Sequence, residues 1–219
     1  MQAFPTLSLR ITEIFHSIQG ESSSMGNPTT FVRLTGCPLR CQYCDTAYAF
    51  AGGEIMTIDA VLRSVGAAPA RFVTVTGGEP LAQPAVHPLM TALCDRGYRV
   101  SLETSGAINI ADVDDRVTIV MDLKTPGSGE SHRNDYRNIE RLTDTDEVKF
   151  VICNDRDYAW ARRKCDELQL RERVGEILFS PSATELPARV LAEWILRDGI
   201  DVRMQIQLHK ALWGDQPGR

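Results

Sequence analysis

Three cysteines crowd into one short stretch of the chain, Cys37-Pro-Leu-Arg-Cys41-Gln-Tyr-Cys44. Their spacing puts three thiolates on a loop that is short enough to wrap around one small iron–sulfur cluster. Three ligands do not satisfy four irons, so a 4Fe-4S cluster bound here keeps one iron open. An open coordination position turns a structural metal site into a reactive one, as it does for zinc. The stretch therefore predicts a reactive 4Fe-4S site on Cys37, Cys41 and Cys44.

An open iron needs a chelating partner, and S-adenosylmethionine (SAM) offers one. Its amino and carboxylate groups are hard ligands that would fill the open position and hold the sulfonium beside the cluster. An electron passed into the carbon–sulfur bond then gives methionine and a 5′-deoxyadenosyl radical. A structural zinc ion completed by His16 or His87 is the alternative. The chain has no second CxxC or HxxxH pair to complete a tetrahedral set, which disfavours zinc.

The composition favours a cytoplasmic protein that acts on a small molecule. The chain has 29 acidic and 24 basic residues, a formal net charge of -5 and no run of five like charges, which does not fit a nucleic-acid binder. No stretch approaches the ~18 apolar residues of a membrane span, and the first residues lack the profile of a signal peptide. The scattered Cys94, Cys153 and Cys165 are expected to be small core residues.

The elements that must position the cysteine loop follow a repeating strand–helix pattern. Alternating, β-rich runs predict strands at 28–35, 71–76, 98–103, 117–123, 146–152, 175–179 and 200–208. Helical periodicity lies between several of them, at 57–66, 86–96, 155–170 and 184–198. Little helical pattern follows the strands at 98–103 and 117–123. The predicted fold is therefore α/β, a partial (open) β/α barrel with a mainly parallel sheet.

The length of 219 residues fits one well-buried core. We therefore expect a single domain over 1–219, with an N-terminal strand and loop extension at 1–27 and a C-terminal tail at 209–219. Polar and glycine-rich motifs fall at five predicted strand ends: TGC, TGGEP, ETSG, DLK and SPS. The carboxyl ends of strands carry the chemistry in such folds, so the five ends are expected to form one site.

The stretch CPLRCQYC has the pattern C-x3-C-x-aromatic-C and resembles the radical SAM superfamily. Within that superfamily, the chain resembles the 7-carboxy-7-deazaguanine synthases over nearly its whole length, through IFHSIQGES, FVRLTGCPLRCQYCDT, TGGEP and QLHK. The resemblance implies the partial barrel and the reductive cleavage of SAM. It also implies a ring contraction of 6-carboxy-5,6,7,8-tetrahydropterin to 7-carboxy-7-deazaguanine, with loss of ammonia, in queuosine and related deazapurine biosynthesis.

The resemblance also implies which residues bind the substrate. An arginine guanidinium holds a carboxylate in a bidentate fork, and this role falls on Arg33. Glutamine and glutamate side chains pair with the donor and acceptor edge of a pterin. The implied substrate-binding residues are Ile18, Gln19, Gly20, Glu21, Arg33 and Thr76. Glu103, Ser105 and His209 are further candidates, with ordinary loop polarity or a surface histidine as the alternative.

The same resemblance implies the cofactor contacts. The implied SAM-binding residues are Tyr43, Cys44, Asp45, Gly78, Glu79, Asp122, Leu123, Lys124, Ser180 and Ser182. The family often has Ser-Pro-Lys where this chain has Asp-Leu-Lys. Magnesium is assigned by the family pattern to Thr46, with water and substrate oxygens completing the octahedron. The residue types alone would favour the neighbouring Asp45 as the ligand, and a turn or N-cap role is the alternative for Thr46.

By resemblance, we expect a flavodoxin-type electron donor and a homodimer. Two other functions fit parts of the pattern. A glycyl-radical enzyme activase shares the cysteine loop and GGEP but needs a protein docking surface in place of a pterin pocket. A non-enzymatic iron–sulfur or zinc protein is the remaining alternative, and motifs at five strand ends argue against it.

Overall fold

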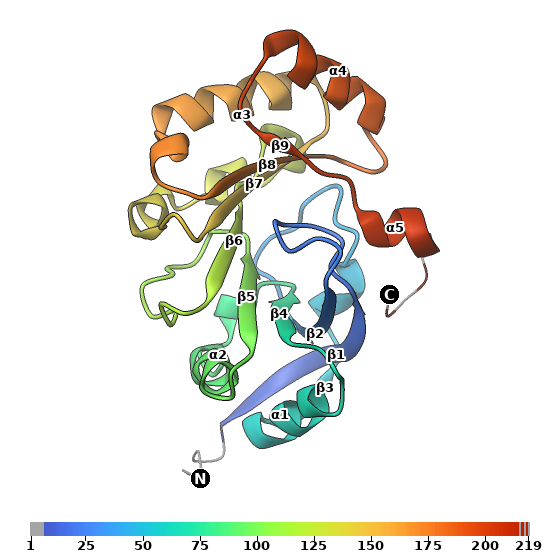
Figure 1. Ribbon diagram of the computed structural model, residues 1–219, viewed down its shortest axis with the longest axis vertical. Helices are drawn as coiled ribbons and strands as arrows, with labels where there is room; N and C mark the ends of the chain where they lie inside the picture. The colour runs from blue at the N-terminus through green and yellow to red at the C-terminus, as the bar shows by residue number, and fades with distance from the viewer. Residues whose placement is uncertain (1–6, 215, 217, 219) are drawn as a thin grey trace.

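The protein folds around one nine-stranded sheet, seen in the computed structural model, which describes residues 7–214, 216 and 218 (Figure 1). The strands are β1 (Ser8–Ile18), β2 (Pro28–Leu34), β3 (Glu54–Thr57), β4 (Phe72–Gly77), β5 (Arg99–Thr104), β6 (Thr118–Asp122), β7 (Glu147–Ile152), β8 (Glu176–Pro181) and β9 (Arg203–Met204). The helices are α1 (Ile58–Gly66), α2 (Val86–Asp95), α3 (Asp155–Glu167), α4 (Ala188–Asp198) and α5 (Leu208–Trp213).

The sheet is open and mainly parallel. Its strand order is β3-β1-β2-β4-β5-β6-β7-β8-β9, and every neighbouring pair from β2 to β9 is parallel. Only β1 runs antiparallel to its neighbours β2 and β3. Parallel strands end at the same edge of a sheet, so the loops after β2, β4, β5, β6 and β8 meet there. This arrangement confirms the predicted partial barrel.

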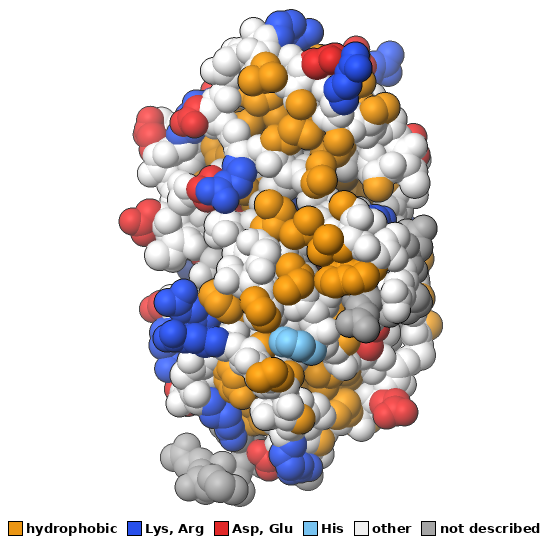
Figure 2. Space-filling view, turned by 45° about the vertical axis from the view of Figure 1, so that its right-hand side comes forward, with side chains coloured by type: hydrophobic (Ala, Val, Ile, Leu, Met, Phe, Trp, Pro, Cys, Tyr) orange, Lys and Arg blue, Asp and Glu red, His pale blue; other side chains and the backbone are white. Residues whose placement is uncertain are grey.

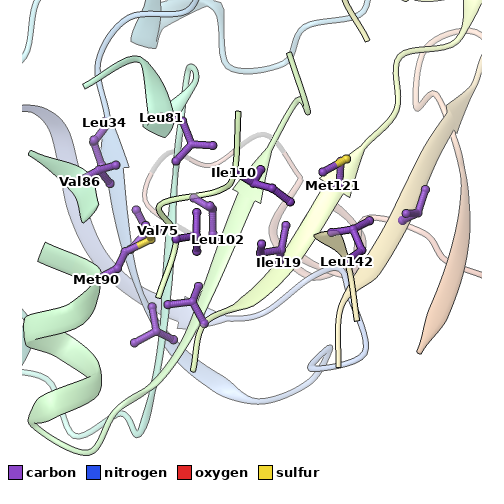
Figure 3. Packing of buried hydrophobic residues seen from close by; sticks show 14 of the residues in the cluster. Leu34, Val75, Leu81, Val86, Met90, Leu102, Ile110, Ile119, Met121 and Leu142 are labelled. Carbon is purple, nitrogen blue, oxygen red and sulfur yellow. The ribbon is translucent and has the colours of Figure 1, made fainter. Parts of the chain in front are cut away.

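The helices α1 to α4 pack on one face of the sheet. Side chains cap the first turns of α1 and α3, where Thr57 accepts from the backbone N–H of Ala60 and Asn154 from that of Asp157. Successive strand residues point to opposite faces, so one set of alternate positions is apolar and meets the helices. In Figure 3, Leu34, Val75 and Leu102 from three strands lie with side chains of α2 in this core. Among the described residues, no helix is both long and apolar enough to cross a membrane.

The opposite face of the sheet, which we call the inner face, is polar. On β2 and β4 the core takes Val32, Leu34, Val73 and Val75, and the residues between them point the other way. The inner face carries Arg33, Thr74, Thr76, Ser101, Glu103, Asp122, Glu147, Lys149 and Ser180. A face of this composition can bind a polar ligand, and the loop 19–27 closes part of it.

The segments after β5 and β6 contain no α-helix, as expected, and the second holds only short 3-10 turns. The expectation of a strand over 200–208 was wrong in extent. Ladder pairing covers only Arg203 and Met204, because β9 is an edge strand and the Gln205 side chain turns to bond the backbone of Ser22 at 3.0 and 2.8 Å. Helix α5 then begins at Leu208. The strand β3 was missed, because four residues carry too little alternation to stand out.

Candidate active site

The cysteine loop follows β2 and is held at several points by the rest of the chain. The backbone N–H of Gly36 donates to Ala49 at 2.8 Å, and that of Gln42 donates to Ser128 at 3.0 Å. The backbone N–H of Arg40 donates to the Glu130 carboxylate at 2.7 Å. The guanidinium of Arg40 lies 4.2 Å from the centroid of the Phe50 ring. The loop is therefore positioned by contacts that do not involve its three thiols.

Cys37, Cys41 and Cys44 are free thiols and partly buried. Burial raises the pKa of Cys41 to about 11, although the ammonium of Lys124 opposes the shift, and burial also raises the pKa of Cys37. Among the described residues, no group of three His, Cys, Asp or Glu side chains surrounds a single ion position. A four-iron cluster does not require that geometry, because each of its thiolates binds a different iron.

The turn after β4 packs directly against the start of the cysteine loop. The backbone N–H of Glu79 donates to the carbonyl of Gly36 at 2.8 Å. The Glu79 side chain is fully buried and accepts four hydrogen bonds: from Leu81 N and Thr104 Oγ1 on one oxygen, and from Ser105 N and Oγ on the other. The hydrogen bonds between Glu79 and Ser105 thus join the end of β4 to the end of β5. They fix the backbone of Gly78, which directly precedes Glu79.

Gly78 leaves no room for a side chain, and we expect Gly78→Ala to disturb the cysteine loop. A Cβ at this position would lie 2.1 Å from the Gly36 oxygen and 2.9 Å from Cys37 Cβ. The backbone must shift, so thermal unfolding should show a loss of about 1–3 kcal/mol and iron incorporation should fall. Gly66→Ala is the matched control, because the atom nearest to a Cβ added there is Tyr98 OH, at 3.8 Å. Full iron content in Gly78→Ala would contradict the prediction.

Three buried polar atoms of the predicted SAM-binding residues lack a hydrogen-bond partner among the described residues: Tyr43 OH, Asp122 Oδ1 and Ser180 Oγ. They come from the cysteine loop and from the ends of β6 and β8. Burial raises the pKa of Tyr43, so its hydroxyl stays protonated and can donate. Buried polar atoms are nearly always paired, so each of these atoms is a candidate to contact a polar ligand.

A chain of alternating charges crosses the inner face. Lys149 Nζ lies 2.5 Å from Glu21 Oε2 and 3.8 Å from Asp122 Oδ2, and Lys124 Nζ lies 2.9 Å from the same Asp122 oxygen. All four side chains are at least four-fifths shielded from solvent. Burial disfavours the charged forms, but the ion pairs outweigh it: they lower the pKa of Glu21 and Asp122 and raise that of Lys124 and Lys149.

A second polar group lies beside this chain, on β4 and β5. Gln19 Nε2 donates to Thr74 Oγ1 at 3.1 Å and to Glu103 Oε1 at 3.4 Å, and Thr76 Oγ1 donates to Glu103 Oε2 at 2.8 Å. Gln19 and Thr76, both predicted to bind substrate, are thereby joined through Glu103. Arg33 is the registered neighbour of Thr76 on β2.

Arg33 is held by one carboxylate and two aromatic rings. Its Nε lies 2.7 Å from Glu13 Oε1, and its guanidinium carbon lies 5.7 Å from the Phe15 centroid and 5.9 Å from that of Tyr48. Tyr48 OH donates to the same Glu13 oxygen at 2.7 Å. The two terminal nitrogens make no hydrogen bond within the described chain, so they remain available for a planar carboxylate.

The C-terminal segment covers the loop that follows β1. The backbone N–H of Leu208 donates to the Gly20 carbonyl at 3.1 Å, and a Cβ on Gly20 would lie 2.3 Å from His209 Nδ1. Gln207 Nε2 donates to Glu21 Oε1 at 3.0 Å and to Asp45 Oδ2 at 2.8 Å. Figure 1 shows α5 beside this loop. The contact accounts for the lack of space at Gly20.

Asp45 and Thr46 lie next to this contact. Thr46 Oγ1 donates to Asp45 Oδ1 at 2.8 Å, and Lys210 Nζ lies 3.5 Å from Asp45 Oδ2. Partial burial works against the ionised form of Asp45, but the hydrogen bonds from Gln207 and Thr46 outweigh it and lower its pKa. Because the hydroxyl hydrogen of Thr46 is committed to Asp45, the lone pairs of its oxygen are free.

The structure brings most of the sequence-predicted residues to the same edge and inner face of the sheet. Leu123 is different, since its side chain is fully buried in the apolar core and only its backbone can contact a ligand. Ser182 is buried just beyond β8, and Ile18 ends β1. The sequence assigned no role to Lys149 or Glu13, and it marked Gln207 only as part of the QLHK motif. Only the alternation of 146–152, which places Lys149 opposite to its apolar neighbours, carried a signal for the first of these.

Comparison with known proteins agrees with this fold. Residues 31–126 match the Radical SAM superfamily. A 7-carboxy-7-deazaguanine synthase of Chlorobaculum tepidum is 45% identical over 208 residues, covering 94% of each chain, and that of Koribacter versatilis is 41% identical over 219 residues, covering 94% of this chain and 97% of that one. A crystal structure of QueE from Escherichia coli shares the fold with a TM-score of 0.76, at 23% identity over 92% of this chain and 95% of that one. The chain therefore belongs to the 7-carboxy-7-deazaguanine synthase family of the radical SAM superfamily.

Proposed function

We propose that the protein converts 6-carboxy-5,6,7,8-tetrahydropterin to 7-carboxy-7-deazaguanine, with loss of ammonia, using SAM and a 4Fe-4S cluster. The observation that carries the proposal is the inner face of the sheet. There a guanidinium with free donors, Arg33, lies one strand from the Gln19–Glu103–Thr76 group. A carboxylated pterin presents the matching groups: a carboxylate, and a flat ring edge of donors and acceptors. The same face leads to the cysteine loop through Lys149, Asp122 and Lys124.

The residues present fit the cluster and SAM. Cys37, Cys41 and Cys44 are free thiols on one externally braced loop, and they would hold three irons. When bound, the cluster supplies the electron that cleaves SAM reductively. The partnerless Asp122 Oδ1, Ser180 Oγ and Tyr43 OH suit the hydroxyl and amino groups of SAM. Gly78 and Glu79 supply a fixed backbone for its methionine part, while Cys44, Asp45, Leu123, Lys124 and Ser182 complete the proposed contacts.

The chain's own residues would orient the pterin and exclude water around it. The terminal nitrogens of Arg33 would hold the substrate carboxylate, since Nε is already fixed by Glu13. Ionised Glu21 would accept hydrogen bonds from the amino-pyrimidine edge, and the backbone at Ile18 and Gly20 would line it. The segment from Gln207 to Lys210 closes over Gly20 and Glu21, which keeps this part of the site away from solvent.

We further propose that Thr46 binds magnesium, with Asp45 holding the hydroxyl hydrogen so that the oxygen faces the ion. Thr46→Ala should raise the magnesium concentration needed for half-maximal pterin binding by about tenfold, because it removes a direct ligand. Equilibrium dialysis of the pterin against a magnesium series measures this shift. Thr145→Ala, at an exposed loop threonine, is the control and should leave the midpoint unchanged. An unchanged midpoint in Thr46→Ala would remove the metal assignment.

The test of the reaction is an anaerobic incubation of the reconstituted protein with SAM, magnesium, a low-potential reductant and the carboxylated tetrahydropterin. Mass spectrometry follows the products. We expect 5′-deoxyadenosine together with 7-carboxy-7-deazaguanine. Deoxyadenosine without the ring-contracted product would reject the substrate and favour a glycyl-radical enzyme activase. A cluster whose spectrum does not respond to SAM would reject radical chemistry.

We also propose a homodimer, a flavodoxin-type electron donor and a cytoplasmic location. Figure 2 supports the first, because hydrophobic side chains gather in a band along one face of the molecule. Contiguous exposed apolar surface of this kind marks contact sites in soluble proteins. Sedimentation velocity of the reconstituted protein at micromolar concentration tests the dimer.

A further inference from the structure

Lys149 is a largely buried lysine on the inner face, and the proposed function gives it no role in binding the pterin or SAM. It lies on β7, between the loop that carries Glu21 and the end of β6 that carries Asp122. Only 12% of its side chain is exposed. A lysine is almost never buried without a partner, because the loss of hydration disfavours its charge. Its environment must therefore contain carboxylates that keep it charged.

We propose that Lys149 is the positioning residue that keeps Glu21 ionised and aimed at the pterin, with Asp122 anchoring its ammonium from the SAM side. The geometry assigns the two carboxylates different roles. Glu21 Oε2 has Lys149 as its ammonium partner at 2.5 Å, whereas Asp122 keeps a second one, Lys124, at 2.9 Å. Loss of Lys149 therefore leaves Glu21 without a cation and Asp122 still paired. The inference rests on the proposed function, since it takes Glu21 to contact the pterin.

The charged groups around Glu21 decide what happens when Lys149 is removed. Asp45 from the cysteine loop and Asp122 from β6 face the site with negative charge, and Glu103 from β5 lies close enough to Lys149 to interact with it. Glu147, the inner-face neighbour on β7, is taken up by Ser23. On the C-terminal side, His209 packs on Gly20 and Lys210 pairs with Asp45. The positive charge nearest to Glu21 is thus Lys149.

The sign of the expected change follows from these neighbours. In the natural chain, burial raises the pKa of Glu21, and Lys149 outweighs burial, so the net pKa is lowered and Glu21 is ionised at neutral pH. In Lys149→Met, burial and the repulsion from Asp45 still raise the pKa of Glu21, and only the hydrogen bond from Gln207 lowers it, so this pKa must rise. A protonated Glu21 loses an acceptor for the pterin edge. Pterin binding then needs a proton to leave first.

The experiment measures pterin affinity between pH 6 and 9 by anaerobic equilibrium dialysis. It uses the reconstituted protein with SAM and magnesium present and no reductant, so that nothing turns over. The quantity to compare is the pterin affinity of Lys149→Met divided by that of the natural protein, because this ratio cancels the titration of the pterin itself. As the pH increases, the ratio should rise by up to about tenfold per pH unit and then level off. Lys149→Arg keeps the charge and should show a flat ratio. SAM affinity should change by less than about threefold, because Lys124 still pairs with Asp122.

Glu21→Gln and the double variant Glu21→Gln/Lys149→Met complete the design. The glutamine carries no charge, so the double variant should bind the pterin weakly and with a flat ratio across the pH range. If Lys149→Met alone fails to hold its cluster, recovery of the SAM-responsive cluster spectrum in the double variant supports the same electrostatic role. A double variant as poorly folded as the single one overturns it.

Lys164→Met makes the same substitution on α3, away from the site, and should behave as the natural protein. If the affinity ratio for Lys149→Met is lowered by the same factor at every pH, or stays at one, the inference is overturned and the proposed function stays intact. A natural protein that does not bind the pterin overturns the proposed function, and the inference with it.

Discussion

Replacing Cys41 with alanine is expected to abolish SAM cleavage while the sheet stays folded. Cys41 is one of three thiols on a loop that is fixed by contacts from Ala49, Ser128 and Glu130, and its side chain is not part of the apolar core. Removing it takes one iron ligand and leaves two, which do not hold a four-iron cluster. The free energy of unfolding should change by less than about 1 kcal/mol. Anaerobic SAM cleavage, followed as 5′-deoxyadenosine, should fall to the background of the reductant.

Cys94→Ala is the matched control for this substitution. Cys94 is also a free and partly buried thiol, but it lies on α2, away from the cysteine loop. It should keep its cluster absorbance and its rate of SAM cleavage. Deoxyadenosine formation that persists in Cys41→Ala at the natural rate would reject the assignment of cluster ligands. Loss of the fold in that variant, seen by circular dichroism, would instead show that the loop contributes to stability.

The cysteine loop and the class of fold could be predicted because both are written in local sequence. Three thiols within eight positions need no tertiary information, and strands of six or seven residues separated by amphipathic helices show their periodicity in isolation. The parallel sheet then follows, since a strand–helix–strand unit returns the chain in the same direction. That places the polar motifs at one edge. The residues that could be named in advance are mostly those that lie at this edge.

The partners of those residues could not be predicted, because they are distant in sequence. Lys149 meets Glu21 across 128 positions, and Gln207 meets Asp45 across 162. A lysine inside a strand resembles any solvent-facing alternate residue until the sheet shows that this face is covered. Glu79 illustrates the same limit in a different way. Its motif suggested a ligand contact, whereas its carboxylate is already satisfied by four hydrogen bonds within the fold.

One physical rule explains why the class of fold could be predicted from the sequence and why the partners of the site residues could not. Alternation assigns each strand residue to one of two faces, but it does not say which neighbours share that face. The register of the paired strands determines these neighbours, and it places Arg33 beside Thr76 and Asp122 beside Lys149. The inner face therefore becomes a surface of charges and hydroxyls only after the strands have paired. Substrate specificity is expected to depend on these pairings more than on the cysteine motif.

Arg33→Ala is expected to weaken pterin binding by roughly 100-fold and to leave SAM affinity within about threefold of its natural value. Arg33 is already oriented by Glu13, Phe15 and Tyr48, so its terminal nitrogens are preorganised for a carboxylate. A charged, paired hydrogen bond of this kind contributes about 2–3 kcal/mol, which accounts for the size of the loss. Anaerobic equilibrium dialysis of the pterin and of SAM gives the two affinities separately.

Arg99→Ala is a closely matched control, because Arg99 also lies on a strand with its guanidinium carbon 5.4 Å from an aromatic ring, that of Phe72. It stands at the amino end of β5, so its loss should not change pterin affinity. Arg33→Lys should recover only part of the binding, since an ammonium cannot form the two parallel hydrogen bonds of a guanidinium. If Arg33→Ala and Arg99→Ala bind the pterin equally well, the carboxylate must be held elsewhere. If Arg33→Ala loses SAM affinity to the same degree, Arg33 supports the cofactor side of the inner face and the pterin must lie nearer to Glu21 and Lys149.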